Sequence, residues 1–138
     1  MKKSILGCTA LMGIGLGAYY LFQLSVEGQS VEFSEPESRD EALHLMDLLD
    51  SRHDFRTALE VSESAHDLPG SDKEFARLLR SEARILWKIY EDFEAARRSL
   101  DLNESLDIEA TESALERVRL EIEAQDFDAA MSAARRAR

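Results

Sequence analysis

A five-residue pattern that recurs three times constrains the fold of this chain more than any other feature. The string Asp-Phe-x-x-Ala occurs at residues 54–58, 92–96 and 126–130. The three phenylalanines are separated by 38 and then by 34 residues. Self-similarity at a period in this range is typical of arrays in which each small unit buries its apolar face against its neighbours. The sequence therefore predicts a stack of similar units.

A period of 34, with an aromatic residue followed three positions later by alanine, resembles the tetratricopeptide repeat family. The resemblance covers roughly residues 39–138, or about three repeats, and it implies a pair of antiparallel helices in each repeat. It also implies that the aromatic residue opens the second helix and that the alanine lets this helix pack closely on the first. The matching pairs are Phe55 and Ala58, Phe93 and Ala96, and Phe127 and Ala130. Ala65 matches a further small position, and Pro69 lies close to the proline that often closes a repeat.

The chain departs from the family pattern in the turn between the two helices. The glycine expected there is replaced in the three repeats by His53, Glu91 and Gln125. The small residue expected nine positions before the aromatic is, by direct count, Met46, Arg84 and Val118. Ala83 fits the second repeat only if that turn carries one extra residue.

Hydrophobic periodicity independently predicts an all-α domain of six helices. We expect them near 39–51, 54–66, 72–90, 93–103, 107–124 and 127–137. Ser71 and Glu74 have the spacing of a capping box, and each repeated aspartate stands where it can cap the following helix. The expected core comprises Leu45, Leu49, Phe55, Leu59, Leu79, Leu86, Phe93, Leu100, Val118, Ile122 and Phe127.

Residues 5–24 contain no charged side chain and are long enough to cross a bilayer as a helix. Lys2 and Lys3 precede this run and carboxylates follow it, so the positive-inside bias predicts a cytoplasmic N-terminus. We expect a signal-anchor over residues 1–26, a polar linker over 27–38, and a helical repeat domain over 39–138 on the other side of the membrane. This topology predicts a single-pass protein of a bacterial inner membrane with its domain in the periplasm.

A cleaved signal peptide is the alternative to an uncleaved anchor, and the state of association of the apolar run also stays open. A cleaved signal peptide would use the small residues before Tyr19, whereas a lipoprotein signal at Cys8 has too short an apolar run before it. Gly13 and Gly17 form a G-x-x-x-G pair, which lets two membrane helices pack closely. The alternative is a lone anchor.

The composition gives little support to catalysis, metal binding or nucleic-acid binding. The net charge of −11 disfavours contact with a phosphate backbone. The single cysteine, Cys8, excludes an intrachain disulfide, and His44, His53 and His66 do not form an i, i+4 ligand pair. After residue 26 only Gly28 and Gly70 remain, so a glycine-rich phosphate loop is missing. We expect no catalytic residue, no metal and no cofactor.

The third predicted helix carries a basic stripe opposite its apolar face. The stripe comprises Arg77, Arg80, Arg84 and Lys88, at spacings of three and four. The family resemblance implies that first helices line a concave protein-binding groove, in which this stripe and Trp87 would lie. The alternative is that the stripe pairs with Asp47 and Asp50 on the neighbouring helix. Glu82 points into the apolar face and requires a hydrogen-bonding partner.

The last predicted helix has a small-residue face formed by Ala130, Ala133, Ala134 and Ala137. No later helix covers this face, so we expect Ala133 and Ala134 to contact a second copy or another protein's helix. Arg135, Arg136 and Arg138 would flank that contact, or would simply complement the C-terminal end of the helix dipole.

These features predict a membrane-anchored scaffold or assembly adaptor that binds other proteins rather than an enzyme. The alternative is a small accessory subunit of a larger membrane complex, held there by its transmembrane helix. The two differ in whether binding survives removal of the anchor.

Overall fold

A computed structural model describes residues 24–26, 29–31 and 34–137. The chain divides into two units, Met1–Glu35 and Pro36–Arg138. Each unit is described by itself.

In the first unit, two short strands pair antiparallel. They are β1, Leu24–Val26, and β2, Gln29–Val31, with Leu24 opposite Val31. The predicted membrane span, including Gly13 and Gly17, lies outside the described residues except for Leu24, which begins β1. Strand β2 falls in the segment predicted as a linker. Within the part of the chain that the structure describes, no helix is long and apolar enough to cross a membrane.

The described residues of the second unit, 36–137, form helices joined by short turns, which confirms the all-α expectation for the domain. The α-helices are α1, Arg39–Ser51; α2, Phe55–Ser64; α3, Asp72–Ile89; α4, Phe93–Ser105; α5, Ala110–Glu123; and α6, Phe127–Arg136. One turn of 3-10 helix, η1 (Ala65–Asp67), follows α2. The predicted helix ends agree with these bounds to within three residues.

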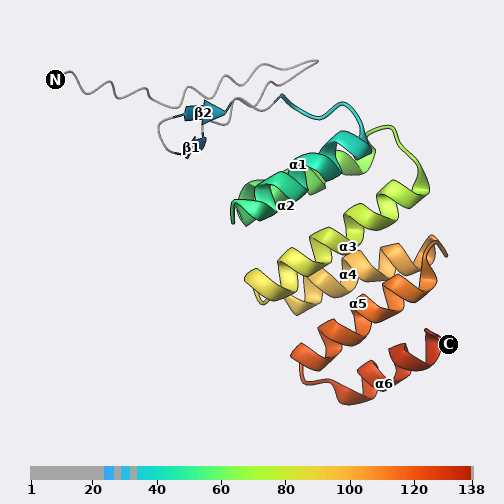
Figure 1. Ribbon diagram of the computed structural model, residues 1–138. Coiled ribbons are helices and arrows are strands. Elements are labelled where there is room, and N and C mark those ends of the chain that lie inside the picture. The colour runs from blue at the N-terminus through green and yellow to red at the C-terminus, as the bar shows by residue number, and fades with distance from the viewer. Residues whose placement is uncertain (1–23, 27–28, 32–33, 138) are drawn as a thin grey trace. The chain divides into compact units, whose positions relative to one another are not determined.

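The helices form three pairs that stack in chain order, as Figure 1 shows. Within the pairs, α1 packs on α2, α3 on α4, and α5 on α6. Between the pairs, α3 lies against both α1 and α2, and α5 lies against both α3 and α4. We call these pairs repeats one, two and three.

Local capping accounts for where several helices begin. The side chains of Asp54, Asp92 and Asp126 accept hydrogen bonds from the backbone N–H three residues later, at the start of the second helix of each repeat. Ser71 and Glu74 form the predicted capping box at the start of α3. These contacts satisfy N–H groups that the first turn of a helix leaves unpaired.

The turn inside each repeat places one residue in the left-handed region. These residues are His53, Glu91 and Gln125, with φ of 60°, 55° and 61°. They occupy the position where a glycine was expected, because glycine adopts this backbone conformation without steric cost. The absence of glycine therefore leaves the turn geometry intact at some cost in strain.

The second of these turns carries the extra residue that the sequence required. The amide of Asp54 donates to the carbonyl of Leu49, five positions earlier, and Asp126 donates to Glu121 in the same way. The amide of Asp92 instead donates to Leu86, six positions earlier. This shift places Ala83 in the close contact between α3 and α4, where it is buried.

The core follows the prediction in repeats one and two and departs from it in repeat three. Leu49, Leu79 and Leu100 are fully buried, and the other predicted core residues up to Val118 are half-buried. Ile122 and Phe127 are exposed, so the prediction is wrong for these two side chains. They lie on the face of repeat three where a further helix would pack.

Candidate functional site

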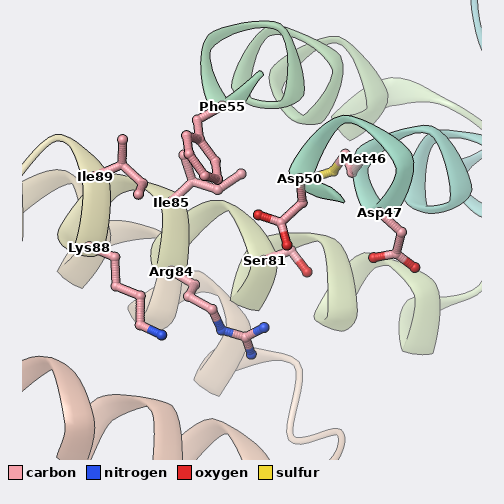
Figure 2. A pocket seen from close by; sticks show the side chains of 9 residues that line it. All are labelled: Met46, Asp47, Asp50, Phe55, Ser81, Arg84, Ile85, Lys88 and Ile89. Carbon is pink, nitrogen blue, oxygen red and sulfur yellow. The ribbon is translucent and has the colours of Figure 1, made fainter. Parts of the chain in front are cut away.

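An open groove of about 240 Å³ lies between repeat one and repeat two. Figure 2 shows the side chains that line it. They are Met46, Asp47 and Asp50 of α1, Phe55 of α2, and Ser81, Arg84, Ile85, Lys88 and Ile89 of α3. The groove exists because α3 packs against both helices of repeat one.

The groove combines an apolar wall with charges of both signs. Met46 and Ile85 are buried at its base, Phe55 is half-buried, and Ile89 is exposed. The carboxylates of α1 lie on one side and the cationic side chains of α3 on the other (Figure 2). Such a surface suits a ligand that carries an apolar side chain beside polar groups, as peptide segments do.

The structure separates the members of the predicted basic stripe. Arg80 is buried and pairs with Glu109, and Arg84 pairs with Glu116, so both reach forward to repeat three. Arg77 is exposed. The predicted pairing of the stripe with Asp47 and Asp50 is therefore wrong, since none of the ion pairs within residues 34–137 joins those groups.

Trp87 differs from the expectation. Trp87 is buried in the cluster formed with Ala83, Leu100 and Leu120, so its indole is part of the core rather than of a binding surface. Lys88 lines the groove, and its Nζ atom lies 5.3 Å from the centroid of the Trp87 ring. The Lys88 amine forms no ion pair with any residue of the described part of the chain, which leaves it available to a ligand.

Ion pairs join repeat two to repeat three and hold the groove helix in place. The Arg80 guanidinium holds the pKa of the Glu109 carboxyl below its usual range, chiefly through their hydrogen bond. On the other side of the stack, Arg97 binds buried Glu121 at 2.6 Å, and this hydrogen bond raises the pKa of the arginine. Because one partner of each pair is largely shielded from water, these contacts are less screened than surface pairs. The Arg80–Glu109 pair joins α3 to repeat three, and the Arg97–Glu121 pair joins α4 to α5.

Glu82 has the hydrogen-bonding partners that the sequence required. Its carboxylate is buried and accepts from the hydroxyls of Ser62 at 2.9 Å and Ser99 at 2.6 Å. The Nε2 atom of His66 lies 2.8 Å from the same carboxylate. We call Ser62, His66, Glu82 and Ser99 the Glu82 cluster. It links α2, η1, α3 and α4 and thus joins repeats one and two.

The Glu82 cluster has the residue types of a hydrolase site but a different connectivity. Both serine hydroxyls donate to the carboxylate rather than to His66. A serine nucleophile requires a base that takes its proton, usually an imidazole held by the carboxylate. The observed pattern is that of a structural polar network. Among residues 24–26, 29–31 and 34–137, no group of three His, Cys, Asp or Glu side chains is placed to hold a metal ion.

The small-residue face of α6 is only partly open. Ala130 and Ala133 are buried, and α6 packs against α5. The expectation that Ala133 is free to meet a partner is therefore wrong, because the face that carries it turns inward. Ala134 is exposed, as expected.

Sequence reasoning missed the apolar residues of the groove. Ile85 and Ile89 lie on the apolar face of the third predicted helix, for which no binding role was predicted, and Phe55 was predicted to be a core residue. Their signal was the spacing of four residues between Ile85 and Ile89, which places both on one stripe of the helix. The packing of α3 across repeat one turns this stripe into a groove wall.

Comparisons with known proteins identify no relative of this chain. No protein-family model, no curated protein and no solved structure matches this chain.

Proposed function

We propose that this protein is a membrane-anchored scaffold of the tetratricopeptide type that binds another protein through the groove between repeats one and two. The observation that carries this proposal is the groove itself, which has an apolar wall and three charged side chains, Asp47, Asp50 and Lys88, without an ion-pair partner among the described residues. Concave surfaces that are mostly apolar and carry a few polar groups are typical ligand-binding sites.

The repeat geometry supports the tetratricopeptide-like part of the proposal. The three helix pairs, the aspartate caps and the left-handed turn residues recur in each repeat. The alanine that follows each motif phenylalanine by three positions is buried in all three repeats. These features agree with the helix-pair arrangement that the resemblance implies.

The location is proposed from the sequence. The charge-free run of residues 5–24 serves as the anchor, and the flanking charges put the helical domain in the periplasm. In this arrangement the protein brings a partner to the membrane surface by non-covalent binding.

Photo-crosslinking from within the groove tests the binding site. A photoreactive amino acid at Ile89, in the full chain in cells, should give a discrete protein adduct. The same amino acid at Leu102, which is exposed to a similar degree on α4, should not. Asp50→Lys, which replaces a groove carboxylate, should remove the Ile89 adduct. Equal adducts from both positions, or an adduct that survives Asp50→Lys, would contradict the proposed site.

Removal of the anchor separates the adaptor from the alternative, an accessory subunit of a membrane complex. The full chain and residues 27–138 are compared in a pull-down after membrane solubilisation. An adaptor keeps its partner when residues 1–26 are deleted. Loss of the partner with retained helicity favours the accessory subunit.

A further inference from the structure

Four large apolar side chains are exposed on repeat three, at the end of the stack. Leu115 and Ile122 of α5 are 47% and 49% exposed, and Phe127 and Met131 of α6 are 64% and 57% exposed. Leu115 and Ile122 are seven residues apart, Phe127 and Met131 are four apart, and the two helices pack together, which makes one continuous surface. We call these four residues the end face. Large apolar patches of this kind mark interaction surfaces.

Repeat one shows what covers the same surface inside the stack. The hydrogen bonds of the two turns align repeat one with repeat three at a constant shift, with Asp54 and Leu49 corresponding to Asp126 and Glu121. By this shift, the counterparts of three end-face residues are Leu43, Phe55 and Leu59. In repeat one these are buried or half-buried, because α3 lies across α1 and α2. The end face is therefore the surface that the first helix of a following repeat covers.

One position on each first helix faces the preceding repeat. In α3 this position is Ile85, which contributes with Phe55 to the wall between repeats one and two, and in α5 it is Leu120. Both are buried, at 7% and 0% exposure. The same position in α1 is Leu48, which is 38% exposed. Within the described helical unit, the stack thus has an exposed apolar surface on repeat three and a partly exposed apolar side chain, Leu48, on repeat one.

We propose that the end face binds the α1 surface around Leu48 of a second copy of this chain. In this contact, Leu48 of one copy packs against Phe127 and Met131 of the other, in the same way as Ile85 packs against repeat one. The two surfaces differ from each other, so the contact is head-to-tail and extends the helical stack from one copy into the next. This inference does not depend on the groove and adds a self-association surface to the protein.

Charged side chains border the apolar residues at both ends of the stack. Helix α1 carries four carboxylates and one arginine, which are Asp40, Glu41, Asp47, Asp50 and Arg39. Helix α6 ends with Arg135 and Arg136, although it also carries Asp128, and Arg119 of α5 already pairs with Glu116 of the same helix. The basic end of α6 can pair with the carboxylates of α1 in a head-to-tail contact, whereas a contact between two α1 surfaces would bring like charges together.

Disulfide cross-linking between full-length chains tests the orientation. Cys8 is first replaced by serine, and single cysteines are then introduced as Leu48→Cys, Met131→Cys and, as a control of similar exposure, Leu102→Cys. A mixture of the Leu48→Cys and Met131→Cys chains should form a cross-linked dimer under mild oxidation. Each of these chains alone, and the Leu102→Cys chain with either, should give only the background level. A chain that carries both Leu48→Cys and Met131→Cys should form a ladder of multimers.

The Phe127→Glu substitution, which places a charge in the end face, should abolish the contact between the two copies. This substitution is added to the Met131→Cys chain, which is then mixed with the Leu48→Cys chain. Cross-linking should fall to the background level of the Leu102→Cys chain, and the helicity measured by circular dichroism should be unchanged. Efficient cross-linking of the Met131→Cys chain with itself would show a symmetric contact and overturn the proposal. Cross-linking at background level in the Leu48→Cys and Met131→Cys mixture would also overturn it, because both side chains are accessible in the single copy.

Discussion

Replacement of Glu82 by alanine should destabilise the domain more than the removal of any exposed carboxylate. Ser62 is fully buried and has Glu82 as its hydrogen-bond acceptor at 2.9 Å. Ser99 has a second, longer contact to the carbonyl of Ala95 at 3.4 Å, and His66 is partly exposed and can turn to water. Removing Glu82 thus leaves one hydroxyl without an acceptor and a second with a poor one.

The magnitude follows from these contacts. An unsatisfied buried donor costs about 1–3 kcal/mol, and a hydrogen bond to a charged group contributes about 1.5–3 kcal/mol, with incomplete additivity among neighbours. We expect Glu82→Ala to lower the free energy of unfolding by about 2–4 kcal/mol, a large part of the ~5–15 kcal/mol that stabilises a typical domain. Glu63→Ala, on the exposed surface of α2, should change it by less than ~0.5 kcal/mol.

The assay is urea unfolding of the full chain, followed by far-ultraviolet circular dichroism in one mild detergent for all variants. A further variant distinguishes the polar network from simple loss of packing. Glu82→Leu combined with Ser62→Ala and Ser99→Ala removes the donors together with their acceptor, and should recover at least half of the stability that Glu82→Ala loses. If Glu82→Ala costs no more than Glu63→Ala, the Glu82 cluster does not join repeats one and two and the reasoning is refuted.

Three further predictions test the repeat register, the turns and the ion pairs. Ala96 is fully buried between α3 and α4, so Ala96→Leu should cost about 1–3 kcal/mol of unfolding free energy, whereas exposed Glu94→Gln should cost less than ~0.5 kcal/mol; equal tolerance would contradict the register. Gln125 has a φ of 61°, so Gln125→Gly should raise the denaturation midpoint by relieving strain, with a net gain of about 0.5–1 kcal/mol, and a lower midpoint would be evidence against strain in this turn. Arg80 lowers the pKa of Glu109, so their pair stabilises the fold above the ordinary carboxyl pKa and loses this contribution as the pH falls below it. Glu109→Gln should therefore reduce stability at neutral pH and make its decline between about pH 5 and pH 3 shallower in a series of thermal melts, and an unchanged decline would exclude this pair as a source of acid sensitivity.

Local signals in the sequence were enough to predict the helices and their turns. The spacing of apolar residues and the aspartate before each motif phenylalanine placed all six helices within three residues of their observed ends. The extra residue in the second turn was also predictable, because Ala83 matches the small position only if α3 is shifted by one. These features depend on contacts within a few residues of each other, and such contacts are encoded locally.

Ion-pair partners and groove walls depended on the tertiary structure. A helical wheel shows that Arg80 and Arg84 share a face, but either the preceding or the following repeat could supply their carboxylates. The packing of α5 beside α3 decided this in favour of Glu109 and Glu116. The same packing turned Ile85 and Ile89 from generic apolar residues into one wall of a groove.

The sequence by itself determined the repeat, its helices and the apolar stripe on each helix, because these follow from residue spacing along one chain. Only the tertiary structure decided which stripes are covered. Phe55 and Phe127 hold the same place in their repeats, yet Phe55 is half-buried beneath α3 and Phe127 is exposed at the end of the stack. The periodicity of the sequence shows which side chains are apolar and which face of the helix they occupy. Burial requires a second surface, and that surface belongs to the element that packs against the helix in the tertiary structure.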